Sequence, residues 1–465
     1  MPSTSSERGE ESFPLIGAQQ LHHAILAAHP EVETAIGTSY RLTGPLDAER
    51  LVRALERTVR RHDALRIGVS DEHGRQWLGR QWVQPLPAMR DLLTFQEIKA
   101  RDERQFARYA TAMLATDVRS PWDLCRGLPF RFRLYRYSPD LHALLCSFSH
   151  LALDLHGCDI VLREIWNGYL SADMAEDRAE KPAGSFAQAA KEHASRPKRP
   201  IGALPRPYRS DDWVRRPGRW RAECIGGSPE ESAVLSLCDG ALTALREDWH
   251  RRNVTEFQGL VTAVAAAVFE LSDEQELHIA IPVDTRRVHE RETAGMFAIP
   301  ASVFLRRAPS VEQLLEQVRR EVYLAVMRAQ TNPRELVEEH LATSLQNDED
   351  PRRINISYIA RKGDEDGFKV GDLTVVQGAY DVPVRYIPPE LEVQAVGAET
   401  VLRLQIFFGG ALACDRFAGE MTARLHGALS AVRSEARMLR GNGPTEQRGD
   451  GETANVSVFE KNGRR

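Results

Sequence analysis

A histidine and an aspartate four residues apart, His150 and Asp154, are the side chains whose type and spacing could do chemistry here. A histidine titrates near neutral pH, so it can take a proton from a nucleophile or steady a developing oxyanion. A carboxylate buried beside it needs a cation or several hydrogen-bond donors. On spacing alone the structural alternative is favoured, with His150 as a hydrogen-bonded, partly buried histidine and Asp154 as the cap of a following helix.

Local patterns place His150 between a strand and a helix. Residues 130–136 alternate strictly between apolar and polar, and residues 143–148 form a continuous apolar run, so both segments predict strands and the second is the more deeply buried. Residues 159–166 then carry apolar side chains at helical spacing. His150 is therefore expected in the loop that follows a buried strand, a common position for a catalytic side chain.

Other kinds of chemistry find no support in the sequence. The chain has no glycine-rich phosphate loop, no GxSxG elbow and no HExxH or comparable metal set. Its six cysteines lack metal-type spacing, which predicts buried, reduced thiols, and Cys158 has no nucleophile signature around it. We therefore expect no bound cofactor and no metal. Any activity is expected to be group transfer carried out by a few polar side chains.

Composition indicates a globular protein with two lobes, because 465 residues exceed one ordinary core. The hydrophobic content of 42%, the charged content of 27% and the net charge of −5 give no reason to expect nucleic acid or a membrane as partner. There is no apolar run of transmembrane length and no secretion signal, so a cytoplasmic location is expected.

The organisation predicted along the chain has five parts. They are a flexible N-terminus (1–12), an N-terminal lobe (13–175), a crossover linker rich in proline and arginine (176–225), a C-terminal lobe (226–440) and a disordered tail (441–465). Strands and helices alternate irregularly in both lobes with similar inventories. This predicts an α/β fold of two related lobes with a cleft between them.

Several boundaries follow from capping and breaking residues. Asp47 is the expected N-cap of a helix carrying Leu51 and Leu55, and residues 64–69 are expected to be a strand. In the second half, Asp239 is expected to cap one helix and residues 255–271 to form a strongly apolar one.

A series of motifs resembles the condensation domains of nonribosomal peptide synthetases, in the chloramphenicol-acetyltransferase-like superfamily, from about Phe13 to Arg440. The motifs follow the family's order, which makes the resemblance specific. They lie at 13–19 (FPLIGAQ), 42–47 with 61–66, 121–131, 282–286 (PVDTR) with 295–297, and 330–338. The resemblance implies an α/β fold of two chloramphenicol-acetyltransferase-like lobes. These lobes would form a V shape, with the active site in the cleft between them.

The family's core signature, His-His-x-x-x-Asp-Gly, corresponds to residues 149–155. The resemblance implies that His150 is the catalytic histidine, which positions or deprotonates the nucleophile attacking a carrier-bound thioester. It also implies that Asp154 is structural and paired with Arg286.

Two residues depart from that signature. Ser149 replaces the first histidine, which in the family is chiefly structural, and Leu155 replaces the glycine. Glycine permits backbone conformations and close substrate approach that leucine does not. Leu155 is therefore expected to narrow the substrate channel, to reshape it for another substrate, or to mark a site without activity, and Gly157 is a candidate to restore the lost flexibility.

The resemblance implies an acyltransferase of natural-product biosynthesis. It would move an acyl or aminoacyl group from the phosphopantetheine of a peptidyl or acyl carrier protein, bound in trans, to a small-molecule or carrier-bound amine or alcohol. Because the sequence shows no carrier, adenylation or thioesterase motif, the domain is expected to be free-standing. Two alternatives remain open, a catalytically degenerate module that docks a partner on a carrier-bound intermediate and a coenzyme A-dependent acyltransferase of the same fold.

Overall fold

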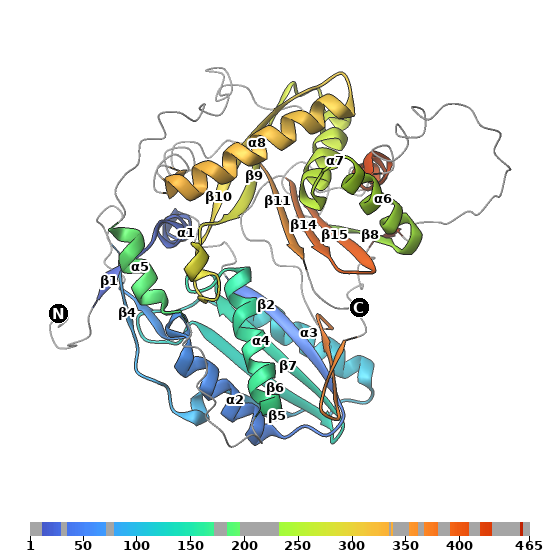
Figure 1. Ribbon diagram of the computed structural model, residues 1–465. Helices are drawn as coiled ribbons and strands as arrows, with labels where there is room; N and C mark the ends of the chain where they lie inside the picture. The colour runs from blue at the N-terminus through green and yellow to red at the C-terminus, as the bar shows by residue number, and fades with distance from the viewer. Residues whose placement is uncertain are drawn as a thin grey trace.

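The protein consists of two lobes, each built on a sheet with helices packed against it (Figure 1). The computed structural model describes residues 12–28, 35–70, 79–171, 184–195, 232–333, 336–337, 353–360, 367–379, 391–408, 419–429 and 456–458. The predicted α/β class with two lobes is confirmed.

The N-terminal lobe contains a six-stranded sheet in the order β12-β13-β2-β7-β6-β5. Its strands are β2 (Ala35–Thr43), β5 (Thr94–Glu97), β6 (Phe130–Ser138), β7 (Leu141–Ser149), β12 (Phe368–Val370) and β13 (Leu373–Gln377). β7 is buried at all nine positions, as its apolar run predicts, and it pairs with β6 and β2. This strand delivers His150 to the junction of the lobes.

Helices cover both faces of this sheet. α2 (Ala48–Arg61) and α4 (Leu155–Ser171) pack together on one face, and α3 (Glu103–Arg119) covers the other with its own apolar cluster. Asp47 is the N-cap of α2, as predicted, and accepts a hydrogen bond from the Arg50 amide at 2.9 Å. A small sheet of β1 (Phe13–Pro14), β4 (Arg80–Val83) and β3 (Ile67–Val69) lies beside α1 (Gly17–Ala28).

The C-terminal lobe contains a seven-stranded sheet in the order β10-β9-β11-β14-β15-β8-β16. Its strands are β8 (Ser232–Cys238), β9 (Glu276–Asp284), β10 (Ala298–Arg306), β11 (Arg353–Ala360), β14 (Leu391–Gly397), β15 (Val401–Phe408) and β16 (Val456–Val458). Helices α6 (Asp239–Arg251), α7 (Glu256–Leu271) and α8 (Val311–Thr331) accompany it (Figure 1). α7 is buried along most of its length, in agreement with its apolar sequence.

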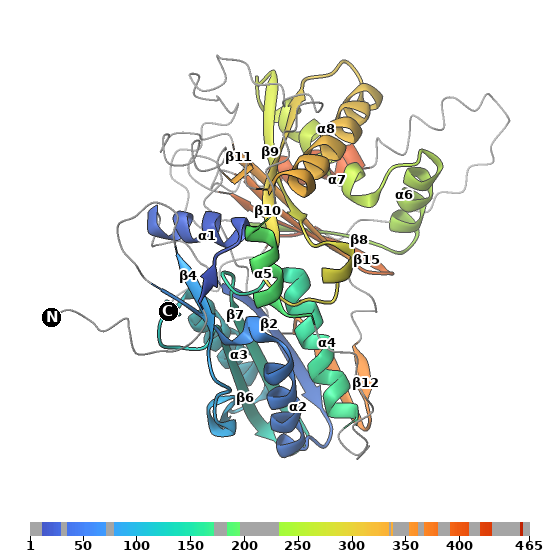
Figure 2. The same cartoon turned by 60° about the vertical axis from the view of Figure 1, so that its left-hand side comes forward.

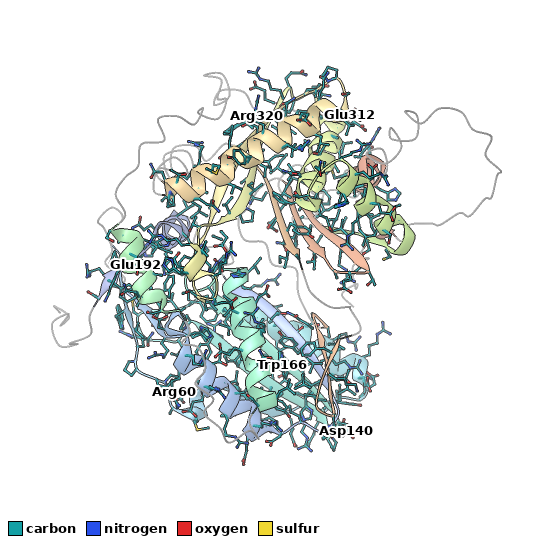
Figure 3. All side chains as sticks on the ribbon, in the orientation of Figure 1. Arg60, Asp140, Trp166, Glu192, Glu312 and Arg320 are labelled. Carbon is teal, nitrogen blue, oxygen red and sulfur yellow. The ribbon has the colours of Figure 1, made fainter. Side chains whose placement is uncertain are left out.

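The predicted boundary of the second lobe is wrong for one hairpin. β13 pairs antiparallel with β2, from Thr374 opposite Thr43 to Gln377 opposite Tyr40, so β12 and β13 complete the sheet of the first lobe. Trp166 of α4, labelled in Figure 3, makes an edge contact with Phe368 at a ring-centroid distance of 6.1 Å. The lobes are therefore joined by shared strands as well as by the chain.

The predicted linker contains a packed helix. α5 (Phe186–Ala194) buries Phe186 and packs against β1, so this part is not a solvated crossover. Asp63 anchors its first turn, accepting hydrogen bonds from Ser185 Oγ (2.6 Å) and from the amides of Phe186 (2.8 Å) and Ala187 (3.0 Å). Residues 176–183 and 196–225 of the predicted linker lie outside the described residues.

Three smaller expectations also differ from the structure. Residues 64–69 form a strand only from Ile67, because a 3-10 turn (Asp63–Arg66) precedes it. Asp239 is the first residue of α6, and Cys238 is the N-cap. β16 pairs with β8, so the predicted disordered tail contains a strand at these three residues.

Among the described residues, no single helix has the length and apolarity to cross a bilayer. One pair of consecutive helices, 240–251 and 256–271, meets the length and composition criteria only when taken together, and its two helices are bent by 103°.

Candidate active site

His150 lies in a tight turn between β7 and α4, where the sequence placed it. The amides of Ala152 and Leu153 donate to the Ser149 carbonyl at 3.0 and 3.2 Å, which closes the turn. The His150 Nδ1 lies 3.0 Å from the Leu153 carbonyl oxygen. A carbonyl can only accept, so Nδ1 carries the proton in the neutral ring and the lone pair resides on Nε2.

The protonation state of His150 suits proton transfer. The ring is partly buried, and burial lowers its pKa below the ordinary value of 6.5. A hydrogen bond to its own backbone, then the charge of Asp154 and the hydrogen bond to the Leu153 carbonyl, oppose this lowering of the pKa without cancelling it. At neutral pH the imidazole is therefore uncharged and able to accept a proton at Nε2.

Asp154 is held as a fully paired carboxylate. It receives two hydrogen bonds of 2.8 Å from Arg286 and three from the backbone amides of Gly157 (2.7 Å), Phe297 (2.9 Å) and Ala298 (3.1 Å). Burial disfavours its charge, but Arg286 and these amides outweigh burial and lower its pKa. With its oxygens occupied by five donors, Asp154 is poorly suited to proton shuttling.

Arg286 comes from the second lobe, in the loop between β9 and β10. Its Nε donates to the Thr293 carbonyl at 3.0 Å and its Nη2 to the Gly295 carbonyl at 2.9 Å, while its guanidinium lies 4.3 Å from the centre of the Phe297 ring. The pairing with Asp154 that the resemblance implied is thus present in the structure. It fixes this loop of one lobe to the histidine-bearing turn of the other.

Leu155 causes no backbone strain. It is the first residue of α4, and the only described non-glycine residue with a positive φ is Asn253. The backbone at this position therefore has a conformation that leucine adopts without strain. Leu155 therefore differs from the family's glycine through its side chain. This side chain is partly buried and packs against the hydrophobic core beside the His150 turn.

Close packing at the start of α4 requires a glycine at position 157. This glycine is helical and is not among the glycines with positive φ, so its backbone has a conformation open to any residue. A Cβ at this position would lie 2.9 Å from both the amide nitrogen and the carbonyl oxygen of Gly295. Gly157 therefore lets the start of α4 approach the loop that carries Arg286.

Ser149 and Cys158 are buried beside the site. Ser149 is 2% exposed at the end of β7, and its amide donates to the Pro129 carbonyl at 2.9 Å. Cys158 is 3% exposed, and burial, followed by the neighbouring carboxylate Asp154, raises its pKa well above the ordinary value. A thiol that resists ionisation is a poor nucleophile, in agreement with the structural interpretation.

Sequence reasoning missed a second histidine at this site. His22 of α1 lies with its ring centroid 5.0 Å from that of His150, at an interplanar angle of 45°. Burial, and then the positive charge of a protonated His150, keep its pKa well below the usual value. The available signal was its place three residues after Gln19 of the opening motif, since such residues share a helix face.

Comparisons with known proteins were consistent with this geometry. The family described as "Condensation domain" matches residues 10–200. Cyclosporin synthetase simA of Tolypocladium inflatum is 23% identical over 279 residues, covering 54% of this chain. The chain spans only 2% of the length of that synthetase.

Solved structures with the same fold cover almost the whole chain. The starter condensation domain of rhizomide synthetase RzmA, as a variant in complex with C8-CoA, matches with a TM-score of 0.71 and 18% identity, over 91% of this chain and 95% of that one. The X-domain from teicoplanin biosynthesis, in complex with OxyB, matches with a TM-score of 0.68 and 19% identity. The match covers 94% of this chain and 96% of the X-domain chain. At such low identity these matches establish the fold.

Proposed function

We propose that this chain, which has the fold of condensation domains and matches their family model over residues 10–200, transfers an acyl or aminoacyl group from a carrier-protein thioester to an amine or alcohol, forming an amide or an ester. The observation that carries this proposal is His150, an uncharged imidazole whose Nδ1 is tied to the Leu153 carbonyl and whose Nε2 holds the lone pair. The acyl group would arrive on the phosphopantetheine arm of a carrier protein, which is substrate and not a resident cofactor.

In this reaction, His150 Nε2 accepts a hydrogen bond from the N–H or O–H of the acceptor. The acceptor's nitrogen or oxygen attacks the thioester carbonyl carbon, and the carbon–sulfur bond breaks. The acceptor's proton passes to Nε2 and then to the departing thiolate, so that the ring ends uncharged again. Holding the acceptor in place contributes to the rate together with the proton transfer.

The clamp between Asp154 and Arg286 supports the reaction indirectly. It links the turn bearing His150 to the second lobe through charge-assisted hydrogen bonds. Both side chains are almost fully buried, at 3% and 1% exposed, so the clamp is rigid and exchanges no proton with the substrate. Their proposed role is to hold the catalytic turn in register with the facing loop.

The central test is turnover by the full chain. Carrier proteins loaded with acyl and aminoacyl pantetheine are incubated with the protein and a panel of amines and alcohols, and intact mass spectrometry follows loss of the acyl group and gain of product. We expect His150→Ala to lower kcat by roughly 100-fold or more, the range for losing a general base. His250→Ala, at an exposed histidine near the end of α6, is the control. Unchanged turnover in His150→Ala would refute the assigned role.

A docking function is the second candidate, and the Leu155 side chain favours it. This side chain stands beside the His150 turn in place of the family's glycine, and the similar X-domain was solved in complex with a partner, OxyB. Tight carrier binding with no product from any donor or acceptor would support docking over catalysis.

A coenzyme A-dependent transfer is the third candidate, because the similar RzmA domain was solved with C8-CoA. Turnover of octanoyl-CoA in the absence of any carrier protein would support it.

A further inference from the structure

Helix α1 brings a second imidazole to the catalytic turn. α1 lies at the junction of the lobes, in contact with β10 of the second lobe (Figure 2). From this helix His22 faces His150, with ring centroids 5.0 Å apart. None of the roles assigned above uses this side chain.

The position of His22 is fixed by the helix residue three places before it. Gln19 is fully buried, and its Nε2 donates to the carbonyl of Leu151, the residue after His150, at 3.0 Å. Its Oε1 accepts a hydrogen bond from the Ile16 amide at 3.1 Å, and its Nε2 also donates to Gln81 Oε1 at 2.9 Å. Since residues three apart share a helix face, this anchor holds the His22 ring against the turn.

One ring nitrogen of His22 lacks a partner. Its Nε2 is buried and makes no hydrogen bond within the part of the chain that the structure describes. A buried polar atom without a partner is costly, and most such atoms in native structures have an explanation. Beside a catalytic histidine, the plain explanation is that the partner arrives with the substrate.

The chemistry of the neutral ring identifies that partner. Burial keeps His22 uncharged, so one nitrogen is a donor and the other an acceptor. In the proposed reaction His150 Nε2 accepts the acceptor's proton, and the remaining group that needs a partner is the thioester oxygen, on which negative charge develops.

We propose that His22 is a second substrate-contacting histidine, whose Nε2–H donates a hydrogen bond to the thioester carbonyl oxygen while His150 receives the acceptor's proton. This rests on the proposed function. No covalent bond to His22 forms or breaks, because it only stabilises the oxygen during attack.

The test compares three variants of the full chain with the donor and acceptor that the wild type uses best. His22→Leu keeps the bulk and removes the donor, and we expect kcat/KM to fall about tenfold, in the range of one lost hydrogen bond. His22→Gln carries an amide that reaches the place of Nε2, and we expect it to recover most of this loss. His23→Leu, one residue along the same helix, should remain within about threefold of wild type.

Each outcome decides the proposal. His22→Leu within threefold of wild type would overturn it, and so would an equal loss in His22→Leu and His22→Gln, because a merely structural role predicts no rescue by an amide. If the wild type shows no turnover, the proposed function fails, and binding of a carrier protein loaded with octanoyl pantetheine then tests His22. Binding at least fivefold weaker in His22→Leu supports the contact; equal binding, or no binding even by the wild type, overturns it.

Discussion

Gly157 of α4 and Gly295 of the β9–β10 loop approach each other so closely that a Cβ on Gly157 would lie 2.9 Å from the backbone nitrogen and oxygen of Gly295. This approach places the two sides of the Asp154–Arg286 clamp within hydrogen-bonding reach. The contact is between two backbones, so no flexible side chain can move aside to accommodate extra atoms.

We therefore predict that Gly157→Ala lowers the free energy of unfolding by about 1–3 kcal/mol, the range for overpacking a filled site. Gly168→Ala in the same helix is the matched control, because its Cβ would meet Ala54 at 3.4 Å, an ordinary contact. There the gain in helix propensity predicts no loss and up to about 1 kcal/mol of stabilisation. Urea unfolding measures both, and similar values for the two variants would contradict the close-approach argument.

Removing the charge of Asp154 should destabilise the protein strongly. Asp154→Asn leaves the buried Arg286 without its main partner, and we expect a loss of about 3 kcal/mol or more. The control is Glu292→Gln, in the exposed pair with Arg163 that also joins α4 to the β9–β10 loop, with side chains 72% and 58% exposed. An exposed pair contributes at most about 1 kcal/mol. Thermal melts should show a much larger fall in Tm for Asp154→Asn than for Glu292→Gln. Equal falls in Tm would contradict the prediction.

The stabilisation by Asp154 should vanish in acid. Its pKa in the folded state lies below the ordinary value of 3.8, so the unfolded chain takes up a proton first as pH falls. The contribution is therefore complete above about pH 4 to 5 and is lost as pH falls through the folded pKa. Unfolding free energies of wild type and Asp154→Asn, measured from pH 6 to pH 3, should converge toward the acid end. A constant difference would argue against this linkage.

Activity should persist below the ordinary pKa of histidine. Because burial lowers the pKa of His150 below 6.5, its neutral form survives to a lower pH than in a free imidazole. The acid limb of a plot of kcat/KM against pH is therefore expected below pH 6.5. A limb at or above this pH would contradict an uncharged, desolvated His150 as the base.

The carboxylate of Asp63 should be needed for α5 to dock. It accepts three hydrogen bonds at the start of this helix. We expect Asp63→Ala to cost about 1–2 kcal/mol of stability, the upper range for a lost cap, and to increase hydrogen exchange in residues 186–194. Asp47→Ala, which removes a cap bond of 2.9 Å from α2, should leave exchange in residues 186–194 unchanged. Unaltered exchange at α5 in Asp63→Ala would show that other contacts hold it.

Local pattern was sufficient for the elements that carry the turn bearing His150. The apolar run of β7, the helical spacing of α4 and the cap at Asp47 are properties of neighbouring residues, so the sequence predicts them directly. The pairing of Asp154 with Arg286 spans 132 residues, and only the resemblance to a family indicated it.

The features that sequence reasoning missed depend on contacts between distant segments. Three contacts produce no periodic pattern in the sequence. They are the pairing of β13 with β2, the hydrogen bonds from α5 to Asp63 and the approach of His22 to His150. The packing requirements at positions 155 and 157 were hidden for a related reason. Whether position 155 or 157 needs a glycine depends on the φ angle and on the opposite backbone, neither of which the signature specifies.

The pairing of β13 with β2 also constrains how the protein is made. A ribosome releases Tyr40 long before it reaches Gln377, the residue that lies opposite Tyr40 in the sheet. Until then the edge of β2 has unsatisfied backbone donors and acceptors that another chain could pair with. The first lobe cannot complete its sheet during early synthesis, and a gene fragment ending near residue 200 would yield a polypeptide prone to association.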